Sequence, residues 1–203
     1  MKNRDAFLCY GILLAAGQGK RFDPSGRQYK LLQTLPTGQT VIARSASQLK
    51  EAFPNSIAVV SENAVQIQQS LTELALPFCI CETAQDGMAN SLVTALRQIP
   101  ADIDAVVIAL ADMPFVRGET LLQIRSSLIG GAEIVVPTYQ GQRGNPVGFA
   151  IKYLPQLLSL QGDRGARQLL QTYPVTEIAV SDQGILRDID VPADLIDTKV
   201  AGT

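Results

Sequence analysis

Short apolar runs alternate along this chain with stretches in which apolar residues recur every three or four positions. The runs are typical of buried strands, and they cover residues 6–16, 56–61, 77–82, 105–110 and 133–139. The stretches between them predict amphipathic helices, with inward positions at Ile42, Ala46, Leu49 and Phe53; at Ile67, Leu71 and Leu74; at Leu92 and Leu96; and at Leu121, Ile124 and Leu128. Strand alternating with helix predicts a three-layer α/β fold with a mostly parallel sheet.

Capping and turn residues mark where these helices begin and end. Thr40 is predicted to cap the first helix, and Asn63 with Gln66 three residues later resembles a capping box for the second. We expect the third helix to begin near Ser91. A glycine pair at 130–131 is predicted to close the fourth helix.

The last third of the chain alternates less cleanly. Its segments cover residues 144–151, 154–173, 176–181 and 187–198, and no linker of low complexity precedes them. We therefore expect one domain over residues 1–203, in which the later segments form a lobe on the same core.

Composition and charge exclude several classes of protein. Hydrophobic residues make up 46% of the chain and charged residues 18%, and no apolar run approaches the roughly 20 residues that a membrane span needs. The first apolar run leads directly into a glycine loop, so we interpret it as a strand and not as a signal peptide. A net charge of −2 without an extended basic run makes nucleic acid an unexpected partner.

The cysteines indicate a reducing compartment. Cys9, Cys79 and Cys81 are odd in number and lie in apolar surroundings, which fits a cytoplasmic protein better than a disulfide framework. The chain contains no histidine, so a zinc site is not expected. We interpret all three cysteines as small core residues.

The first candidate functional residues lie in and after the glycine loop that follows the first predicted strand. Gly17 and Gly19 can adopt positive φ and can direct several backbone N–H groups at one oxygen-rich ligand. Lys20, Arg21 and Lys30 can neutralise the charge of that ligand, which we expect to be a phosphate. The alternative is an ordinary strand-to-helix turn with solvated cations.

Two well-known phosphate loops do not fit this stretch. A Walker loop needs Ser or Thr after Gly19-Lys20, where this chain has Arg21, and an earlier glycine at the position of Leu14. A dinucleotide fingerprint needs a third glycine where this chain has Phe22.

Carboxylates follow at two places. Asp112 ends a buried strand and is restrained by Pro114, so it is a candidate ligand for Mg²⁺, whose shell usually combines one or two carboxylates with phosphates and water. Its alternative role is to cap the next helix. Asp188 and Asp190 are expected on one face of a short strand, where one of them can supply a second metal ligand; their alternative role is to precede a helix that begins at Pro192.

Six sequence blocks, in order, resemble the molybdenum cofactor cytidylyltransferases and, more broadly, the nucleotidyltransferase superfamily that includes sugar-nucleotide pyrophosphorylases. The blocks cover nearly the whole chain, at residues 14–22 with 30–32, 87–92, 110–114, 144–149, 162–167 and 188–194. The block Gly162-Asp163-Arg164-Gly165-Ala166-Arg167 is similar to the molybdopterin-side motif of the cytidylyltransferase branch.

The resemblance implies a Rossmann-like nucleotidyltransferase fold with a nucleotide-binding part over about 1–115 and an acceptor-binding part over about 116–203. It implies that Arg21, Lys30 and Asp112 are catalytic and that Asp112 and Asp190 hold Mg²⁺. The nucleotide-binding residues that it implies are Leu14, Ala15, Ala16, Gly17, Gly19, Lys20, Arg21, Lys30, Asn90 and Ser91. The acceptor-binding residues that it implies are Asn145, Pro146, Asp163 and Arg167.

The activity that this resemblance implies is transfer of CMP from CTP to the phosphate of molybdopterin or its molybdenum form, with release of pyrophosphate. A molybdoenzyme that receives the product is the implied protein partner. Two alternatives stay open: an enzyme of the same architecture that uses GTP or another phosphorylated acceptor, and a non-catalytic nucleotide-binding factor in molybdoenzyme maturation.

Overall fold

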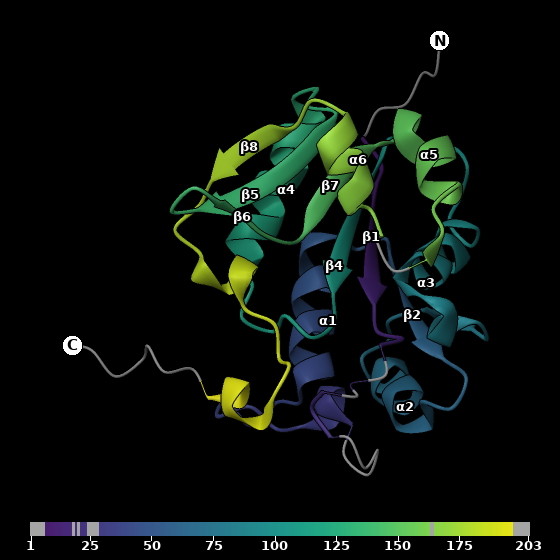
Figure 1. Ribbon diagram of the computed structural model, residues 1–203, viewed down its shortest axis with the longest axis vertical. Coiled ribbons are helices and arrows are strands. Elements are labelled where there is room, and N and C mark those ends of the chain that lie inside the picture. The colour runs from purple at the N-terminus through teal and green to yellow at the C-terminus, as the bar shows by residue number, and fades with distance from the viewer. Residues whose placement is uncertain (1–6, 18, 20, 24–28, 163–164, 197–203) are drawn as a thin grey trace.

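A computed structural model describes residues 7–17, 19, 21–23, 29–162 and 165–196, and it shows a central sheet between two layers of helices (Figure 1). The α/β expectation with a mostly parallel sheet is confirmed. The strands are β1 (Cys9–Leu14), β2 (Ser56–Ser61), β3 (Phe78–Cys81), β4 (Ala105–Leu110), β5 (Ile134–Tyr139), β6 (Gln142–Arg143), β7 (Val147–Ala150) and β8 (Thr176–Ala179).

The sheet has the order β3-β2-β1-β4-β7-β5-β6, and β8 pairs with β5. Strands β1 to β4 are mutually parallel, with Leu14 opposite Leu110 at the carboxyl ends of β1 and β4. β7 runs antiparallel to β4 and β5, so β5 and β8 have the same direction as the first four strands. The carboxyl ends of β1 and β4 therefore meet at one edge of the sheet, where ligands bind in open α/β sheets.

Alternate residues of the buried strands face opposite helical layers. In β4, Ala105, Val107 and Ala109 belong to one apolar cluster, and Val106 and Ile108 belong to the other. The first cluster contains the inward residues of α1 (Val41–Ala52), α2 (Val65–Glu73) and α4 (Gly118–Ile129). The second contains those of α3 (Met88–Leu96), α5 (Leu154–Leu158) and α6 (Arg167–Thr172). Burial on both faces explains why β4 is apolar throughout.

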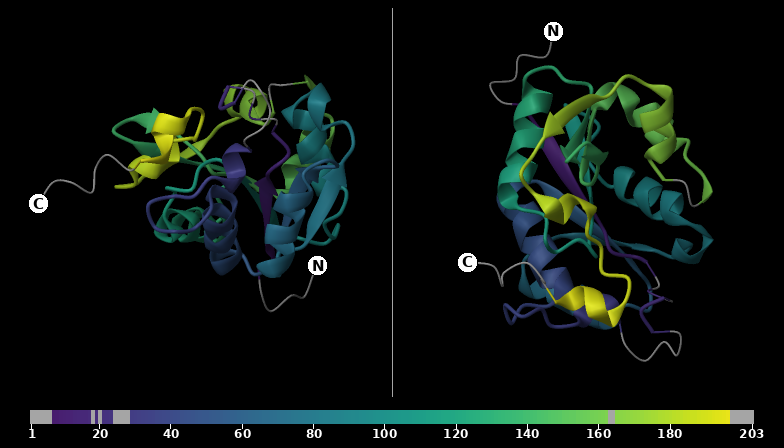
Figure 2. Two further views of the ribbon diagram at one scale, coloured as in Figure 1. Left: turned by 90° about the horizontal axis from the view of Figure 1, so that it is seen from below. Right: turned by 60° about the vertical axis from the view of Figure 1, so that its left-hand side comes forward.

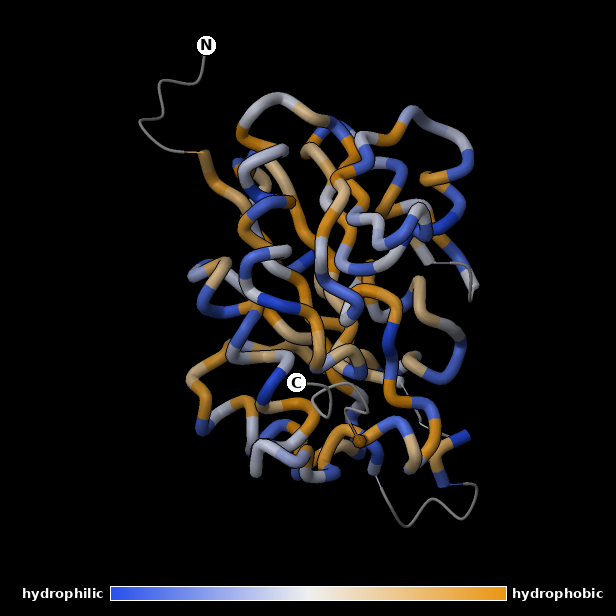
Figure 3. Tube along the Cα trace, turned by 90° about the vertical axis from the view of Figure 1, so that its left-hand side faces the viewer, coloured by the Kyte–Doolittle hydropathy of each residue, from blue (hydrophilic) through white to orange (hydrophobic). Residues whose placement is uncertain are grey.

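Two further views show this arrangement. In the right-hand view of Figure 2, α1 and α4 lie on one side of β1, and α3 and α5 lie on the other. Hydrophobic positions concentrate along the strands in the middle of the molecule, and polar positions concentrate on the outer loops and helix faces (Figure 3).

Short 3₁₀ helices complete the connections between these elements. They are η1 (Lys30–Leu32), η2 (Ala84–Asp86), η3 (Ile151–Tyr153), η5 (Gln183–Leu186) and η6 (Pro192–Leu195). The yellow C-terminal segment in Figure 1 carries η5 and η6, and it runs along the molecule toward the purple η1. Arg21 and Lys30 thereby come into contact with Asp190 of the C-terminal segment.

The structure confirms two predicted helix ends and corrects two others. Gly130 is the C-cap of α4 and Gly131 has positive φ, so the glycine pair closes this helix as expected. Thr40 caps α1, because its hydroxyl oxygen accepts the backbone N–H of Ala43 at 3.3 Å. The capping box at Asn63 is wrong: α2 begins after Ala64, whose N–H donates to the Ser61 carbonyl in the preceding turn. α3 begins three residues before Ser91, at Met88.

Two of the three cysteines are buried core residues, as the sequence analysis predicted. Cys9 and Cys81 are buried and Cys79 is half-buried, and all three are free thiols. Burial raises the pKa of the Cys9 thiol to about 12. Within the described residues, no helix is both long enough and apolar enough to cross a membrane.

Candidate active site

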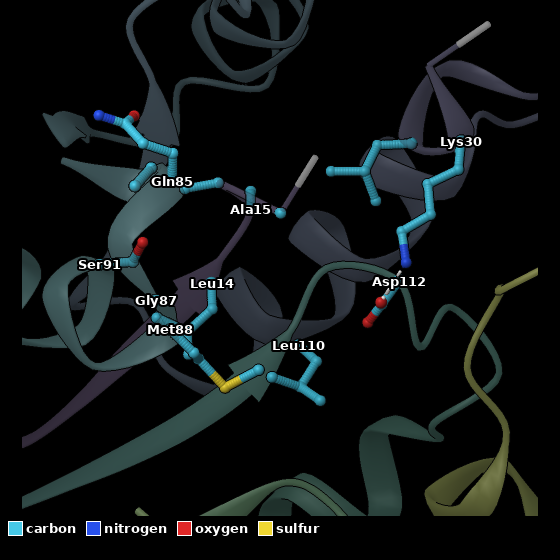
Figure 4. A pocket seen from close by; sticks show the side chains of 13 residues that line it. Leu14, Ala15, Lys30, Gln85, Gly87, Met88, Ser91, Leu110 and Asp112 are labelled. Atoms are coloured by element: carbon cyan, nitrogen blue, oxygen red, sulfur yellow. Dashed lines mark hydrogen bonds and ion pairs between the residues drawn. The ribbon is translucent and has the colours of Figure 1, made fainter. Parts of the chain in front are cut away.

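A cavity of about 270 Å³ opens at the carboxyl ends of β1 and β4 (Figure 4). The glycine loop forms one wall, η1 and the end of β4 form a second, and the start of α3 forms a third. The lining residues are Leu14, Ala15, Ala16, Gly17, Lys30, Leu31, Ala84, Gln85, Gly87, Met88, Ser91, Leu110 and Asp112. The tertiary structure thus brings together predicted nucleotide-binding residues from three separate parts of the chain and the predicted metal ligand Asp112 from a fourth.

The loop after β1 turns at Gly19. Ala15 still donates its N–H to the carbonyl of Val59 at 2.9 Å, which extends the pairing with β2 by one residue. Gly19 has φ +61°, a conformation that favours glycine, whereas Gly17 does not have positive φ, so the expectation for Gly17 is wrong. The carbonyl of Gly19 accepts the N–H of Phe22 at 2.9 Å, and this turn brings Arg21 toward the site.

Two cations and two carboxylates form an ion-pair cluster beside the cavity. Lys30 Nζ lies 2.6 Å from Asp112 Oδ2 and 3.7 Å from Asp190 Oδ1, and Arg21 contacts Asp190 Oδ2 at 2.6 Å. Figure 4 shows the Lys30 side chain extending from η1 to Asp112. The Lys30 side chain is 11% exposed and the Arg21 side chain is 79% exposed. Lys30 is therefore held within the site, and Arg21 lies on its solvent side.

Backbone hydrogen bonds fix the position of Asp112. Ala111 donates its N–H to the carbonyl of Leu14 at 3.0 Å, and its own carbonyl accepts the hydroxyl of Ser45 at 2.8 Å. The carbonyl of Asp112 accepts the N–H of Ile189 at 2.8 Å. These contacts tie the end of β4 to β1, to α1 and to the C-terminal segment.

The helix-cap alternative for Asp112 is wrong. α4 begins at Gly118, six residues after Asp112, and a different carboxylate binds its first turn. Asp182 Oδ2 accepts the N–H of Arg117 at 2.8 Å and the hydroxyl of Thr120 at 2.7 Å. The Asp112 carboxylate is therefore available to the cavity.

The second carboxylate lies on irregular backbone, not on the strand that the sequence suggested. Residues 187–190 carry no regular secondary structure, and Asp190 is brought to Lys30 by the bond between Ile189 and Asp112. Burial raises the pKa of the Asp188 carboxyl, and the neighbouring Asp190 and Asp112 carboxylates raise it further. Asp190, with contacts to both Arg21 and Lys30, is the better placed of the two aspartates.

The donor set fits a hard divalent cation. Asp112 and Asp190 present carboxylate oxygens to one ammonium group, and Mg²⁺ commonly takes one or two carboxylates and completes its shell with phosphate oxygens and water. The described residues contain no cluster of three or more His, Cys, Asp or Glu side chains that could enclose a metal ion by themselves. The remaining ligands would have to come from substrate and solvent.

The start of α3 supplies the opposite wall. Ser91 is buried and lines the cavity, whereas Asn90 does not, because its amide group donates to the carbonyl of Thr83 at 3.3 Å. Gln85 and Met88 line the cavity and were not predicted as site residues. The signal that identifies them is their position between the end of β3 and the start of α3, at the edge where ligands bind.

The predicted acceptor residues are divided between two places. Gly165 is buried beside Met88 of the cavity wall, and exposed Arg167 begins α6 two residues later. Asn145 and Pro146 instead line a small cavity of about 20 Å³ against α1 and α4. The predicted residues Lys20 and Asp163 lie outside the described residues.

Comparisons with known proteins identify the family of this chain. Residues 11–178 match the family model described as MobA-like NTP transferase domain. The chain is 26% identical over 197 residues to purine catabolism protein PucB of Bacillus subtilis, covering 90% of this chain and 91% of PucB. It is 26% identical over 163 residues to bifunctional protein GlmU of Bartonella bacilliformis, covering 78% of this chain and 35% of GlmU. The chain thus spans about a third of the length of that relative.

Solved structures of Rv0371c from Mycobacterium tuberculosis have the same fold. One has a TM-score of 0.80 and 27% identity, and the match covers 93% of this chain and 96% of Rv0371c. A second, in complex with manganese, has a TM-score of 0.72 and 25% identity, and the match covers 92% and 95% of the two chains.

Proposed function

We propose that this chain, which belongs to the MobA-like NTP transferase family, is a metal-dependent cytidylyltransferase that acts on a molybdopterin-type acceptor. The observation that carries the proposal is the cluster of Lys30, Asp112 and Asp190 at the rim of a cavity lined by the glycine loop. Cations for a triphosphate and carboxylates for a metal ion lie side by side there. Nucleotidyl transfer needs both.

The reaction is a displacement at phosphorus. An oxygen of the acceptor phosphate forms a bond to the α-phosphorus of CTP, and the bond between that phosphorus and the bridging oxygen of pyrophosphate breaks. The acceptor phosphate is already an anion, so no general base is required, which suits a chain without histidine. Positioning and charge neutralisation supply the catalysis.

The triphosphate is assigned to the loop and the two cations. The glycine loop, of which Gly17 lines the cavity, is proposed to donate backbone N–H groups to the phosphate oxygens, and Lys30 and Arg21 are proposed to neutralise their charge. The same cations also form ion pairs with Asp112 and Asp190. Binding of the triphosphate therefore draws them away from the carboxylates.

Asp112 and Asp190 are the proposed ligands of Mg²⁺. A bound divalent cation polarises phosphoryl oxygens and neutralises the charge that develops on the leaving pyrophosphate. The manganese complex of Rv0371c supports divalent-metal binding on this fold. The protein's own part is to hold the two carboxylates close together, through the bond between Ile189 and the Asp112 carbonyl.

The nucleoside and the acceptor phosphate are both assigned to the side of the cavity formed by residues 84–91. Ser91 and the residues at 84–88 form the wall proposed for the nucleoside, and CTP is favoured on the resemblance of the sequence blocks. Arg167 is proposed to bind the acceptor phosphate, because Gly165 in the same block lies against Met88 of the cavity wall.

Thermal unfolding with CTP, GTP, ATP and UTP, each with and without Mg²⁺, tests this proposal. A ligand at 100 times its dissociation constant stabilises a fold by about 2.7 kcal/mol, or about 5 to 10 °C for a chain of this size. We expect a magnesium-dependent shift that is largest with CTP. Pyrophosphate release on addition of molybdopterin then tests the acceptor.

The other outcomes separate the alternatives. A shift with GTP and not CTP keeps the reaction but contradicts the nucleotide assignment. Binding of CTP without pyrophosphate release from molybdopterin contradicts the acceptor, and binding without turnover of any phosphorylated acceptor favours a non-catalytic maturation factor. No shift with any nucleotide contradicts the proposal as a whole.

A further inference from the structure

Three consecutive backbone N–H groups around Asp190 are each bound to a carboxyl or carbonyl oxygen. Ile189 donates to the carbonyl of Asp112 at 2.8 Å. Asp190 and Val191 donate to the same carboxylate oxygen, Oδ2 of Asp194, at 2.9 and 2.7 Å. The irregular segment that carries Asp190 is thus fixed on both sides of the aspartate.

We propose that Asp194 is a positioning residue that orients the Asp190 carboxylate for metal binding. The inference rests on the proposed function, since it gives Asp194 a role through a proposed metal ligand. Residues that hold a metal ligand by hydrogen bonds typically affect metal affinity by about ten- to hundred-fold when they are removed. Asp194 holds Asp190 in this way by accepting a hydrogen bond from the backbone N–H of Asp190.

A purely structural role for Asp194 explains only one of its two bonds. η6 begins at Pro192, so a carboxylate at Asp194 that accepts the N–H of Val191 is sufficient to cap this short helix. The additional bond reaches back to Asp190, which precedes the cap. That bond holds the residue whose side chain contacts Arg21 and Lys30.

The need for such support follows from the local backbone. Asp190 lies on a segment without helix or strand, so no ladder of hydrogen bonds fixes its φ and ψ angles. Asp112, by contrast, follows β4, whose pairing with β1 extends to the adjacent Ala111. Asp194 supplies for the second carboxylate the support that the sheet supplies for the first.

Mn²⁺ binding in the presence of CTP tests this inference, with free Mn²⁺ followed by electron paramagnetic resonance and compared with the same CTP concentration without protein. The variants are Asp194→Ala, which removes the acceptor oxygen, and Asp194→Asn, which keeps a neutral one. The matched control is Asp104→Ala, because Asp104 also accepts a backbone N–H, that of Leu8 at 2.8 Å, but at the opposite end of β4. Thermal unfolding establishes that each variant is folded.

We expect Asp194→Ala to weaken Mn²⁺ binding by about ten- to hundred-fold, Asp194→Asn to recover much of that loss, and Asp104→Ala to bind like the parent. CTP binding without metal should be unchanged in Asp194→Ala. Parent-like Mn²⁺ binding by folded Asp194→Ala overturns this inference alone, as does failure of Asp194→Asn to improve on Asp194→Ala. A parent protein that binds no Mn²⁺ with any nucleoside triphosphate overturns both this inference and the proposed metal site.

Discussion

Lys30 Nζ and Asp112 Oδ2 are 2.6 Å apart, although the two residues come from distant parts of the sequence. The same ammonium lies 3.7 Å from Asp190, so Lys30 is close to both carboxylates that are proposed to bind a metal ion. Metal and lysine therefore compete for the same oxygens. A triphosphate that binds Lys30 relieves this competition, and we expect nucleotide and metal to bind cooperatively.

The Lys30→Met variant tests whether Lys30 binds CTP and competes with the metal ion for the carboxylates. Loss of the ammonium should weaken CTP binding by about ten- to hundred-fold, because one charge-assisted hydrogen bond to phosphate is lost. The same variant should bind Mn²⁺ more tightly than the parent when no nucleotide is present, by roughly tenfold, since a cation about 4 Å away is removed. Calorimetric titration measures both affinities. A fall in both would show that Lys30 does not compete with the metal.

Asp112→Asn should stop turnover without unfolding the protein. We expect the rate of pyrophosphate release to fall at least about a hundredfold, since a proposed metal ligand is neutralised. The free energy of unfolding should change by less than about 1 kcal/mol, because Lys30 keeps Asp190 as a partner and repulsion with Asp188 and Asp190 is relieved. Kinetic assays and thermal unfolding of the same preparation check this pair of results, and a large drop in melting temperature would indicate a structural role instead.

Asp182→Ala should destabilise the fold without involving the cavity. Its buried carboxylate accepts the N–H groups of Arg117 and Gly184 and the hydroxyl of Thr120, and it thereby binds the first turn of α4 from a remote part of the chain. Loss of these bonds should lower the free energy of unfolding by about 2 to 4 kcal/mol. Urea denaturation measures the effect. The control is Glu133→Ala, whose solvent-screened ion pair with Lys152 should contribute little to the free energy of unfolding.

Gly184→Ala tests the close approach that directs the C-terminal segment to the site. A methyl group at this position would overlap the backbone of Phe115 and Val116, so we expect a loss of about 1 to 3 kcal/mol of stability. Gly118→Ala is the matched control, because a methyl group at Gly118 meets no atom and should leave stability unchanged or raise it by up to about 1 kcal/mol. Equal unfolding midpoints for the two variants would contradict the close packing at Gly184.

Much of the fold could be predicted because its signals are local. The apolar run of β4 has the same boundaries in the sequence and in the structure, and Thr40 caps α1 as expected. Boundaries set by tertiary contacts could not be predicted: Asn63 does not cap α2, and α3 begins at Met88, since neighbouring turns and packing override the capping preference. The remote cap that Asp182 gives to α4 has no local signal at all.

The sequence by itself determined the order of strands and helices as far as β5, the glycine loop and the residue types available for phosphate and metal, because hydrophobic period, turn preference and charge are properties of short segments. Only the tertiary structure decided that Lys30, rather than solvent, bridges Asp112 and Asp190, and that Asp190 rather than Asp188 contacts both cations. Those relationships depend on a 2.8 Å backbone bond between Ile189 and Asp112. Packing of distant segments creates that bond, and no local pattern encodes it.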